Sequence, residues 1–418
     1  MQKAFKVTLI PNRTQSDLIN RTVGCVRFVY NRFLALRKEV YATDKTTLNY
    51  NECSQKLTLL KNEIEWIKAV DKFALQNSLK ALETAYKNFF SDLKKPKAKR
   101  RFGFPQFKKK HGCKQAYKTN FTNGNIQVRD NYLKLPKLGW VRFHKSQELT
   151  GKLISVTVCC TKPGKYTASI LCESEIDKYP QVNQNIGLDL GIKSYLVTDL
   201  GEVVDNPKYY RTQKRKLRKA HKKLSRSQKG SSNRVKAKIK LAQVYERITN
   251  LRDDFLHKLS TRLIKENSII CIEDLRVANM VKNHKLALSI SDASWSKFGA
   301  ILEYKATWHD RIVQKVGTFF PSSQTCNSCK VINPLVKDLK LREWTCPTCN
   351  SYNLRDKNAA LNILSEGLRL VAKSLGCGSE STKAFQDAAV GAPDAQNAYG
   401  ESVSPRVIQA GLVEVGIA

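Results

Sequence analysis

Two pairs of cysteines near the C-terminal end of the chain have a spacing that suits a metal ion. The pairs are Cys326/Cys329 and Cys346/Cys349, and sixteen residues separate them. A two-residue gap lets both thiolates of a pair face one ion, and two pairs complete a tetrahedron. Four sulfur ligands leave no open position, so the spacing predicts a zinc ribbon whose ion is structural. Redox-active C-x-x-C pairs are the alternative, and this spacing disfavours them.

Three acidic residues occupy positions where a carboxylate needs a partner. Asp189 lies in the apolar segment IGLDLGIK, Glu273 ends the segment SIICIE, and Asp356 opens the segment DKNAALNIL. Divalent metal ions are one kind of partner for carboxylates among apolar strand residues. Two Mg²⁺ ions about 4 Å apart can activate water and stabilise the leaving oxygen in phosphodiester hydrolysis. For each residue alone, a cap, a turn or a salt bridge is the simpler interpretation, and Asp356 has the position of an N-cap.

Two strongly basic segments could contact phosphates. Residues 94–110 hold nine Lys or Arg around Phe102, Phe104 and Phe107, and residues 211–240 hold fourteen Lys or Arg and no acid. Basic side chains can bind phosphates, and aromatic rings can stack on bases. A solvated linker that its phenylalanines anchor is an equal alternative for the first segment. The second could be a solvated helical face, but an acid-free run repels itself, which favours a phosphate backbone.

The composition of the whole chain points to the same partner. The 418 residues include 73 Lys plus Arg against 36 Asp plus Glu, a net charge of +37. Nucleic acid is the usual partner for such an excess, although a chain that is basic only for solubility is the alternative. The length predicts two to four domains. Scattered cysteines, the lack of a long apolar segment and the polar start predict reduced thiols and no membrane contact.

The first half of the chain changes pattern twice. Residues 3–10 have the pattern of a strand, and residues 11–93 have apolar residues at helical spacing, with Thr14 and Asp17 at capping-box spacing. From 125 to 173, short strands alternate with turns, as in a small barrel or sandwich. We expect the opening strand to join this sheet, which makes the helical region an insertion.

The second half alternates strands and helices around the three acidic residues. Residues 186–205 predict three strands with turns at Gly191 and Gly201. SIICIEDL predicts a buried strand of the parallel type. Helices are expected over 211–240 with a break near Gly230, over 243–266, over 292–310 and from DKNAALNIL onward, with a further strand at 311–319. Residues 371–418 hold three Lys or Arg against five acids and predict disorder.

The segments GLDLGIK, CIEDL, the two cysteine pairs and RDKNAALNIL, in this order, resemble the TnpB family of transposon-encoded RNA-guided endonucleases. These are relatives of the compact type V CRISPR effectors. The resemblance covers about residues 1–370, including GCVRFVYN at 24–31. It departs at Leu354, where family members usually have Asp, and at Lys330 and Asn350, where a Gly commonly follows each cysteine pair.

The resemblance implies an α+β multidomain protein. Its parts are an RNase H-like (RuvC) α/β nuclease domain with an inserted zinc ribbon, an oligonucleotide-binding β-barrel (wedge) domain and a helical recognition domain. The boundaries we expect are 1–10 for the first wedge strand, 11–93 for the recognition domain, 94–180 for the rest of the wedge, 181–320 and 353–370 for the nuclease domain, 321–352 for the ribbon, and 371–418 for a disordered tail.

The resemblance also implies a reaction, which is guided cleavage of DNA beside a short adjacent motif by Mg²⁺-assisted hydrolysis. The acidic triad of the family maps onto Asp189, Glu273 and Asp356, as catalytic residues and ligands of two Mg²⁺ ions. The expected partners are a guide RNA from the transposon end and target double-stranded DNA. A monomer in the cytoplasm of a prokaryotic cell, associated with the nucleoid when bound to DNA, is the favoured state.

Candidate nucleic-acid contacts come from a helix proposed to read the adjacent motif and from the two basic segments. They are Lys72, Gln76, Asn77, Arg101, Phe102, Lys108, Lys109, Arg215, Arg218 and Lys222. Other functions are an RNA-guided repressor without cleavage, a transposase proper, and a zinc-ribbon RNA-binding protein without enzyme activity. The filled acidic positions disfavour the first, the lack of a separate end-binding domain disfavours the second, and the order of the carboxylate motifs disfavours the third.

Overall fold

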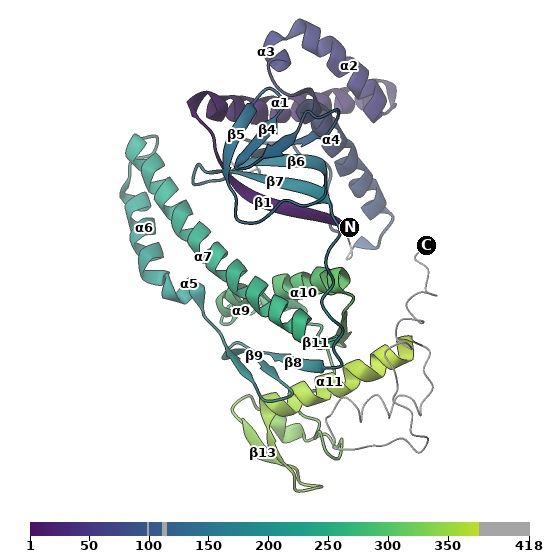
Figure 1. Cartoon of the computed structure of the whole chain (residues 1–418). Helices are drawn as coiled ribbons and strands as arrows, with labels where there is room; N and C mark the ends of the chain where they lie inside the picture. The colour runs from purple at the N-terminus through teal and green to yellow at the C-terminus, as the bar shows by residue number, and fades with distance from the viewer. Residues whose placement is uncertain (98–99, 111–114, 376–418) are drawn as a thin grey trace. The chain divides into compact units, whose positions relative to one another are not determined.

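The computed structural model describes residues 1–97, 100–110 and 115–375 (Figure 1). Most of the tail predicted to be disordered, 371–418, lies outside the described residues. The chain divides into two compact units. The first comprises Met1–Glu175 and Gln228–Ala242, and the second comprises Ile176–Ser227 and the chain from Gln243 on. Among the described helices, none has the length and apolar character needed to cross a membrane.

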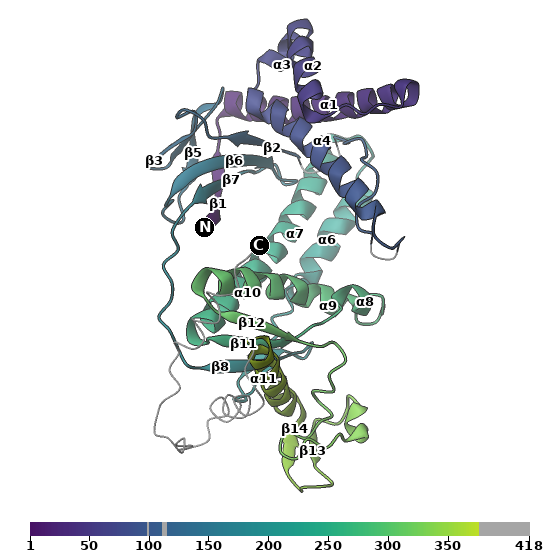
Figure 2. The same cartoon turned by 90° about the vertical axis from the view of Figure 1, so that its right-hand side faces the viewer.

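A seven-stranded antiparallel sheet forms the centre of the first unit. Its strands are β1 (Gln2–Ile10), β2 (Gln115–Asn120), β3 (Gln127–Arg129), β4 (Tyr132–Leu135), β5 (Gly139–His144), β6 (Lys152–Cys160) and β7 (Tyr166–Glu173). The order is β2-β6-β7-β1-β5-β4-β3. Strand β1 pairs with both β7 and β5, which confirms that the opening strand joins the later sheet. Figure 2 shows how the sheet curves.

Between β1 and β2, the described residues form the α-helices α1 (Arg13–Asp44), α2 (Tyr50–Glu63), α3 (Glu65–Lys68) and α4 (Lys72–Leu93). The capping box of α1 consists of Asn12 and Gln15, each accepting a hydrogen bond from the backbone of the other. The predicted box at Thr14 and Asp17 is wrong, because the helix begins at Arg13 and both residues lie inside it.

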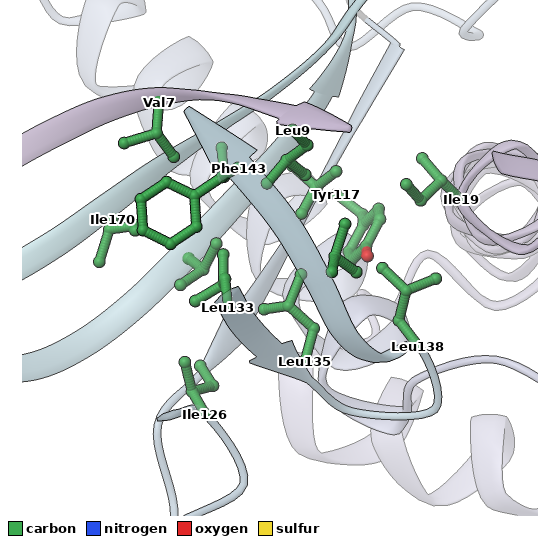
Figure 3. Close-up of a cluster of buried hydrophobic side chains, with 14 of the residues drawn as sticks. Val7, Leu9, Ile19, Tyr117, Ile126, Leu133, Leu135, Leu138, Phe143 and Ile170 are labelled. Carbon is green, nitrogen blue, oxygen red and sulfur yellow. The ribbon is translucent and has the colours of Figure 1, made fainter. Parts of the chain in front are cut away.

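Helices α1 and α4 form a layer on the sheet. Ile19 and Val23 of α1 and Ala74 of α4 join the buried strand residues in one cluster. Figure 3 shows Ile19 beside this cluster, with Leu9 and Phe143 among the strand residues. The opposite sides of α1 and α4 pack with α2 and α3 in a second cluster. The helices therefore share a core with the sheet.

The second unit contains a mixed five-stranded sheet. Its strands are β8 (Asn185–Leu190), β9 (Ser194–Thr198), β10 (Val203–Asp205), β11 (Ile269–Glu273) and β12 (Ile312–Val316), in the order β10-β9-β8-β11-β12. Strands β8, β9 and β10 pair antiparallel, whereas β11 runs parallel to both β8 and β12. The predictions of three strands over 186–205 and of a buried parallel strand at SIICIE are confirmed.

Helices cover both faces of this sheet. The covering helices are α7 (Ser232–Glu266), α8 (Val277–Met280), α9 (Ala287–Ala293), α10 (Trp295–His309) and α11 (Arg355–Ser374), and α5 (Tyr209–Thr212) and α6 (Lys214–Arg226) precede α7 in the sequence; α7 belongs to the first unit up to Ala242. Ile270 and Ile272 of β11 face α7, α9 and α10, and Ile269 and Cys271 face α11. Burial on both faces explains the continuous apolar run. The predicted helix start at 243 is wrong, since α7 begins at Ser232.

A small lobe lies between β12 and α11. It contains a 3₁₀ helix, η2 (Pro334–Lys337), and the two-stranded sheet of β13 (Glu343–Thr345) and β14 (Tyr352–Leu354). Its buried hydrophobic cluster consists of Cys326, Val336, Trp344 and Cys346. A core of four residues is too small to hold a lobe folded, so the lobe needs an additional link.

Candidate functional site

Asp189 and Glu273 lie at the ends of neighbouring parallel strands. Leu188 of β8 is the register partner of Ile272 of β11, so the next residues, Asp189 and Glu273, lie side by side. Leu188 and Ile272 point into the core beneath α7 and α10. Because side chains alternate between the faces of a strand, both carboxylates belong to the opposite face, which α11 covers.

Helix α11 packs against this face closely enough to require glycine. A Cβ atom on Gly187 would collide with the carbonyl oxygen of Ala360, and one on Gly367 would collide with Sγ of Cys271. Asp356 precedes Ala360 by one helical turn, so the two lie on the same side of α11. The helix thus brings Asp356 to the end of the sheet where the two strand carboxylates lie.

The electrostatic surroundings of Asp189 reflect this convergence. Burial, together with the charges of Glu273 and Asp356, raises the pKa of Asp189 to about 8, although Arg355 and Arg342 oppose the shift. Like charges that share a buried site favour retention of a proton on one of them. A bound cation removes that repulsion, so the arrangement suits a divalent metal.

The other two carboxylates have polar partners. The hydroxyl of Ser322 donates to Oε1 of Glu273 at 2.6 Å, and a guanidinium nitrogen of Arg342 lies 3.3 Å from Oδ1 of Asp356. Asp356 does not cap its helix, because the N-cap of α11 is Leu354 and no side-chain cap bond is present. The interpretation of Asp356 as an N-cap is wrong, since the helix already begins at Arg355.

Carboxylate oxygens are the ligands that Mg²⁺ prefers, so the chemistry of the three side chains fits that ion. They are less tightly gathered than the cysteines. Among the described residues, the cysteines are the one group of three or more potential ligands close enough together for a single ion.

The four cysteines converge as the spacing predicts. Their sulfurs all lie within 4.8 Å of one another, with 3.7 Å between Cys326 and Cys349 and 3.5 Å between Cys329 and Cys346. Zinc–sulfur bonds of about 2.3 Å in a tetrahedron place the sulfurs about 3.8 Å apart. The geometry therefore fits a structural zinc ion.

Hydrogen bonds favour the ionised form of one of these thiols, that of Cys326, whereas the neighbouring sulfurs raise the pKa of the Cys329 thiol. Burial opposes ionisation of Cys326, but hydrogen bonds from Ser351 and from the backbone of Cys329 and Ser328 outweigh it and lower the pKa of Cys326 to about 6. The thiolate is the form that binds metal.

Comparisons with known proteins place these sites in a family. A family model of OrfB from IS605, described as "Probable transposase", matches residues 169–284. A "Cas12f1-like, TNB domain" model matches 295–363, and a "Helix-turn-helix domain" model of the OrfB group matches 1–46. A "Putative RNA-guided DNA endonuclease" of Streptomyces pristinaespiralis is 37% identical over 88% of this chain and 90% of that protein. The chain belongs to the IS605 OrfB (TnpB) family.

Two further comparisons extend over most of the chain. InsQ of Escherichia coli K12, a "Putative RNA-guided DNA endonuclease", is 32% identical over 88% of this TnpB-family chain and 93% of its own length. A solved Cas12f1–sgRNA–target DNA complex matches with a TM-score of 0.49 and 17% identity, over 84% of this chain and 83% of the Cas12f1 chain.

The helix predicted to read the adjacent motif is α4. Lys72 is its first residue and is exposed, and Gln76 is half-buried. The amide of Asn77 donates to the Lys118 carbonyl at 2.9 Å and to Asn120 at 3.3 Å. Asn77 therefore joins α4 to β2 within the TnpB-family chain.

The Phe-rich basic segment has a defined backbone in the described residues. The buried carboxylate of Asp92 accepts the backbone N–H groups of Arg101 and Phe102. The ring of Phe102 remains 52% exposed. Asn31 both donates to and accepts from the backbone of Lys108.

Parts of this segment are anchored by their rings, as the linker interpretation predicts. Phe104 packs edge-on against Tyr86 and Phe89, and Lys38 lies over Phe104 and Phe107. Lys109, like Phe102, is exposed. Anchored rings and exposed groups therefore alternate. The linker interpretation holds for the anchored rings, and contact with phosphates or bases stays a prediction for the exposed groups.

The acid-free segment forms α6 and the start of α7. Leu217 is buried, whereas Arg215, Arg218 and Lys222 are exposed on α6. Positions three and four residues apart share one side of a helix. These three cations therefore form a row on α6.

Sequence reasoning missed three polar residues that touch the site, namely Ser322, Asn358 and Asn362. All three are buried. The signal was visible in the segment DKNAALNIL, where two asparagines four residues apart interrupt an otherwise apolar helical stripe. Buried amides need hydrogen-bond partners, so these asparagines predict a second segment packed on α11.

Proposed function

We propose that this chain is an RNA-guided DNA endonuclease of a transposon. It cleaves target DNA beside a short adjacent motif, with Asp189, Glu273 and Asp356 as the catalytic carboxylates. One observation carries the proposal, which is that two strand ends and one helix start bring these carboxylates to the same end of one sheet. The names of the S. pristinaespiralis and E. coli relatives support the guided activity.

The sheet itself supports an RNase H-like (RuvC) assignment. An antiparallel run of three strands is followed by two strands parallel to the first, with helices on both faces. We assign the nuclease domain to residues 181–320 and 353–370, and the ribbon, 321–352, to an insertion within it. The wedge domain comprises 1–10 and 94–180, and the recognition domain comprises 11–93.

The three carboxylates bind Mg²⁺, because this hard cation prefers oxygen ligands of the kind that they offer. When bound, the ions supply activation of water and stabilisation of the leaving oxygen during phosphodiester hydrolysis. The chain's own contribution is to hold the carboxylates in place. Ser322 orients Glu273 through its hydroxyl, and Arg342 holds Asp356.

Guide RNA and target DNA are the proposed partners. Base pairing between guide and target reads the sequence, and the protein binds backbones and a short adjacent motif. Lys72 and Gln76 are assigned to that motif. Arg101, Phe102, Lys108 and Lys109 of the first basic segment, and Arg215, Arg218 and Lys222 of α6, are assigned to nucleic-acid contacts.

Replacement of one carboxylate tests the proposal. We expect Asp189→Ala to abolish cleavage of guide-matched DNA while guide RNA and target binding remain, because this carboxylate is assigned to the metal and not to a nucleic-acid contact. The measurement is cleavage in Mg²⁺ beside target binding by gel shift. Asp205→Ala, an exposed aspartate at the end of β10, is the matched control and should cleave normally.

The outcomes separate the alternative functions. Undiminished cleavage by Asp189→Ala removes this residue from the mechanism. A wild-type protein that binds guided targets without cutting them is a repressor. Guide-independent cutting and joining of transposon ends identifies a transposase, the activity that the family description names.

A further inference from the structure

The side-chain amide of Asn358 holds the backbone on both sides of a zinc ligand. Its Oδ1 accepts the N–H of Asn327 at 2.9 Å, and its Nδ2 donates to the carbonyl of Thr325 at 2.8 Å. Cys326 lies between these two residues. Asn358 is 2% exposed, so its donor and its acceptor are both used by the first cysteine knuckle.

The next turn of the same helix holds the chain leading into that knuckle. Nδ2 of Asn362 donates to the carbonyls of Ser322, at 2.9 Å, and Thr325, at 2.6 Å. Ser322 in turn donates its hydroxyl to Glu273 at 2.6 Å. A set of hydrogen bonds therefore joins the two residues that flank the zinc ligand Cys326 to two turns of α11, and through Ser322 to the carboxylate on β11.

We propose that Asn358, Asn362 and Ser322 are positioning residues through which the zinc-bound knuckle sets the orientation of Glu273 and of the first turns of α11. The inference rests on the proposed nuclease function for its consequence in cleavage. The link itself is a property of the fold and is testable without cleavage.

The chemistry of the three side chains supports a link more specific than packing. Backbone carbonyls and N–H groups of an irregular segment have no regular partners, and an asparagine amide supplies both a donor and an acceptor at fixed separation. Asn358 and Asn362 are four residues apart, so both amides lie on one side of α11. Asp356 precedes Asn358 by two residues on this helix. A shift of the knuckle is therefore transmitted to the helix that carries one carboxylate and to the serine that orients another.

Zinc makes the knuckle a rigid partner for this link. Binding energy in such sites serves as folding energy, so loss of zinc releases the knuckle. Released residues 322–327 cannot hold the amides of α11 or place the Ser322 hydroxyl. We therefore expect the ribbon's zinc, although structural, to set the Mg²⁺ requirement of the carboxylate site.

The first experiment measures the Mg²⁺ concentration for half-maximal cleavage at saturating guide and target. We expect Ser322→Ala and Asn358→Asp to raise it by about 10- to 100-fold, the usual effect of removing groups that orient metal ligands. Ser322→Ala deletes only the hydroxyl and keeps the carbonyl that Asn362 binds. Asn358→Asp keeps the acceptor but removes the donor to Thr325. Guide RNA and target affinity should remain as in the wild type.

Asn267→Asp is the matched control. Asn267 is equally buried, and its amide donates to the Leu263 carbonyl, at the end of β11 opposite Glu273. This variant shows the effect of replacing a buried amide with a carboxyl group in the same unit but outside the proposed link. If the three residues only stabilise the fold, all variants lose folded protein and the Mg²⁺ requirement stays at the wild-type value, which overturns the proposal.

A second experiment needs no cleavage. Zinc is removed from the full-length protein with a chelator, and hydrogen–deuterium exchange is followed in peptides covering 269–275 and 354–362. We expect faster exchange in both peptides after zinc removal. In Asn358→Asp, zinc removal should raise the exchange rate less than in the wild type, because part of the link is already lost. Unchanged exchange in both peptides overturns the link. Faster exchange in a protein that never cleaves guided DNA upholds the link and rejects the proposed function instead.

Discussion

Asp92 is buried and Asp189 is partly buried, and their carboxyl groups ionise at very different pH. A hydrogen bond from Lys95 and the backbone N–H groups of Arg101 and Phe102 lower the pKa of Asp92 to about 2. Burial beside two other carboxylates raises the pKa of Asp189 to about 8. Asp92 therefore stays ionised and organises its neighbours at any physiological pH. The Asp189 site, in contrast, gains stability from a cation.

The anchoring role of Asp92 leads to a prediction with an unusual sign. Asp92→Asn removes a negative charge, which by charge alone strengthens nucleic-acid binding. We expect it to weaken guide RNA binding, because the segment that presents Arg101 and Phe102 loses its ionic acceptor. The loss of binding free energy should not exceed that of one stacked base, about 1–3 kcal/mol, and the affinity of Phe102→Ala measures this maximum.

The control for this prediction is Asp44→Asn, at an exposed aspartate in the same unit. It removes the same charge without touching the segment, so binding should be equal to the wild type or slightly tighter. RNA affinity measured by filter binding separates the two effects. Tighter binding by Asp92→Asn would show that the Phe-rich segment does not depend on this anchor.

A single ligand decides whether the ribbon folds. We expect Cys346→Ser to lose the bound zinc and unfold the lobe, because its buried hydrophobic cluster holds only four residues and zinc binding is worth on the order of 10 kcal/mol. Zinc content per chain is the measurement. Cys160→Ser, at a half-buried thiol in β6, should keep its zinc, and normal zinc content in Cys346→Ser contradicts the assignment.

At the scale of elements, the approach of α11 to the sheet is the critical contact. A methyl group at Gly367 collides with Cys271, so we expect Gly367→Ala to displace the helix and destabilise the protein by about 1–3 kcal/mol. Cleavage should fall as well, since the same helix carries Asp356. Urea unfolding and a cleavage assay measure the two effects.

Gly299 of α10 provides the matched substitution. A Cβ atom there meets nothing within 4 Å, so Gly299→Ala should be neutral or stabilising by about 0.5–1 kcal/mol from helix propensity. If Gly367→Ala behaves in the same way, α11 has room to adjust and the close packing does not set its position.

The elements that carry the carboxylates were predictable because their signals are local. The strand β11 is apolar up to Glu273 since both of its faces are covered, and Gly191 and Gly201 mark the turns between β8 and β9 and between β9 and β10. The separate helix expected from residue 243 does not exist, because lysine and arginine are good helix formers and α7 runs from Ser232 through the basic segment without a break. The short, polar edge strand β2 was missed, since only Tyr117 and Thr119 show the alternation.

The positioning residues were out of reach for a different reason. Asn358 and Asn362 indicate that something polar packs on α11, but the partner is a loop more than thirty residues earlier in the chain. Ser322 comes close to Glu273 because it follows β12 in the chain, and Val316 of β12 is the register partner of Glu273. Long-range pairing of this kind leaves no periodic signal in the sequence.

At the scale of the whole molecule, the charge of +37 is distributed over both compact units. The Phe-rich segment belongs to the first unit and α6 to the second. Each unit therefore presents its own cations to a polyanion. We infer that RNA co-purifies with the protein, because an excess of this size needs neutralising anions.

The last prediction concerns the salt dependence of guide RNA binding. Contacts with about 6–10 phosphates reduce affinity by roughly 10³–10⁵ between 50 and 200 mM salt. Replacing Arg215, Arg218 and Lys222 with Gln should make the slope of log affinity against log salt shallower by about 2, since each phosphate contact of a single strand contributes about 0.7. The control replaces Lys178, Lys258 and Lys297, which already pair with aspartates. Both triple variants lose the same formal charge. A shallower slope only in the α6 variant assigns the effect to direct phosphate contacts, whereas equal slopes in the two variants reduce it to net charge.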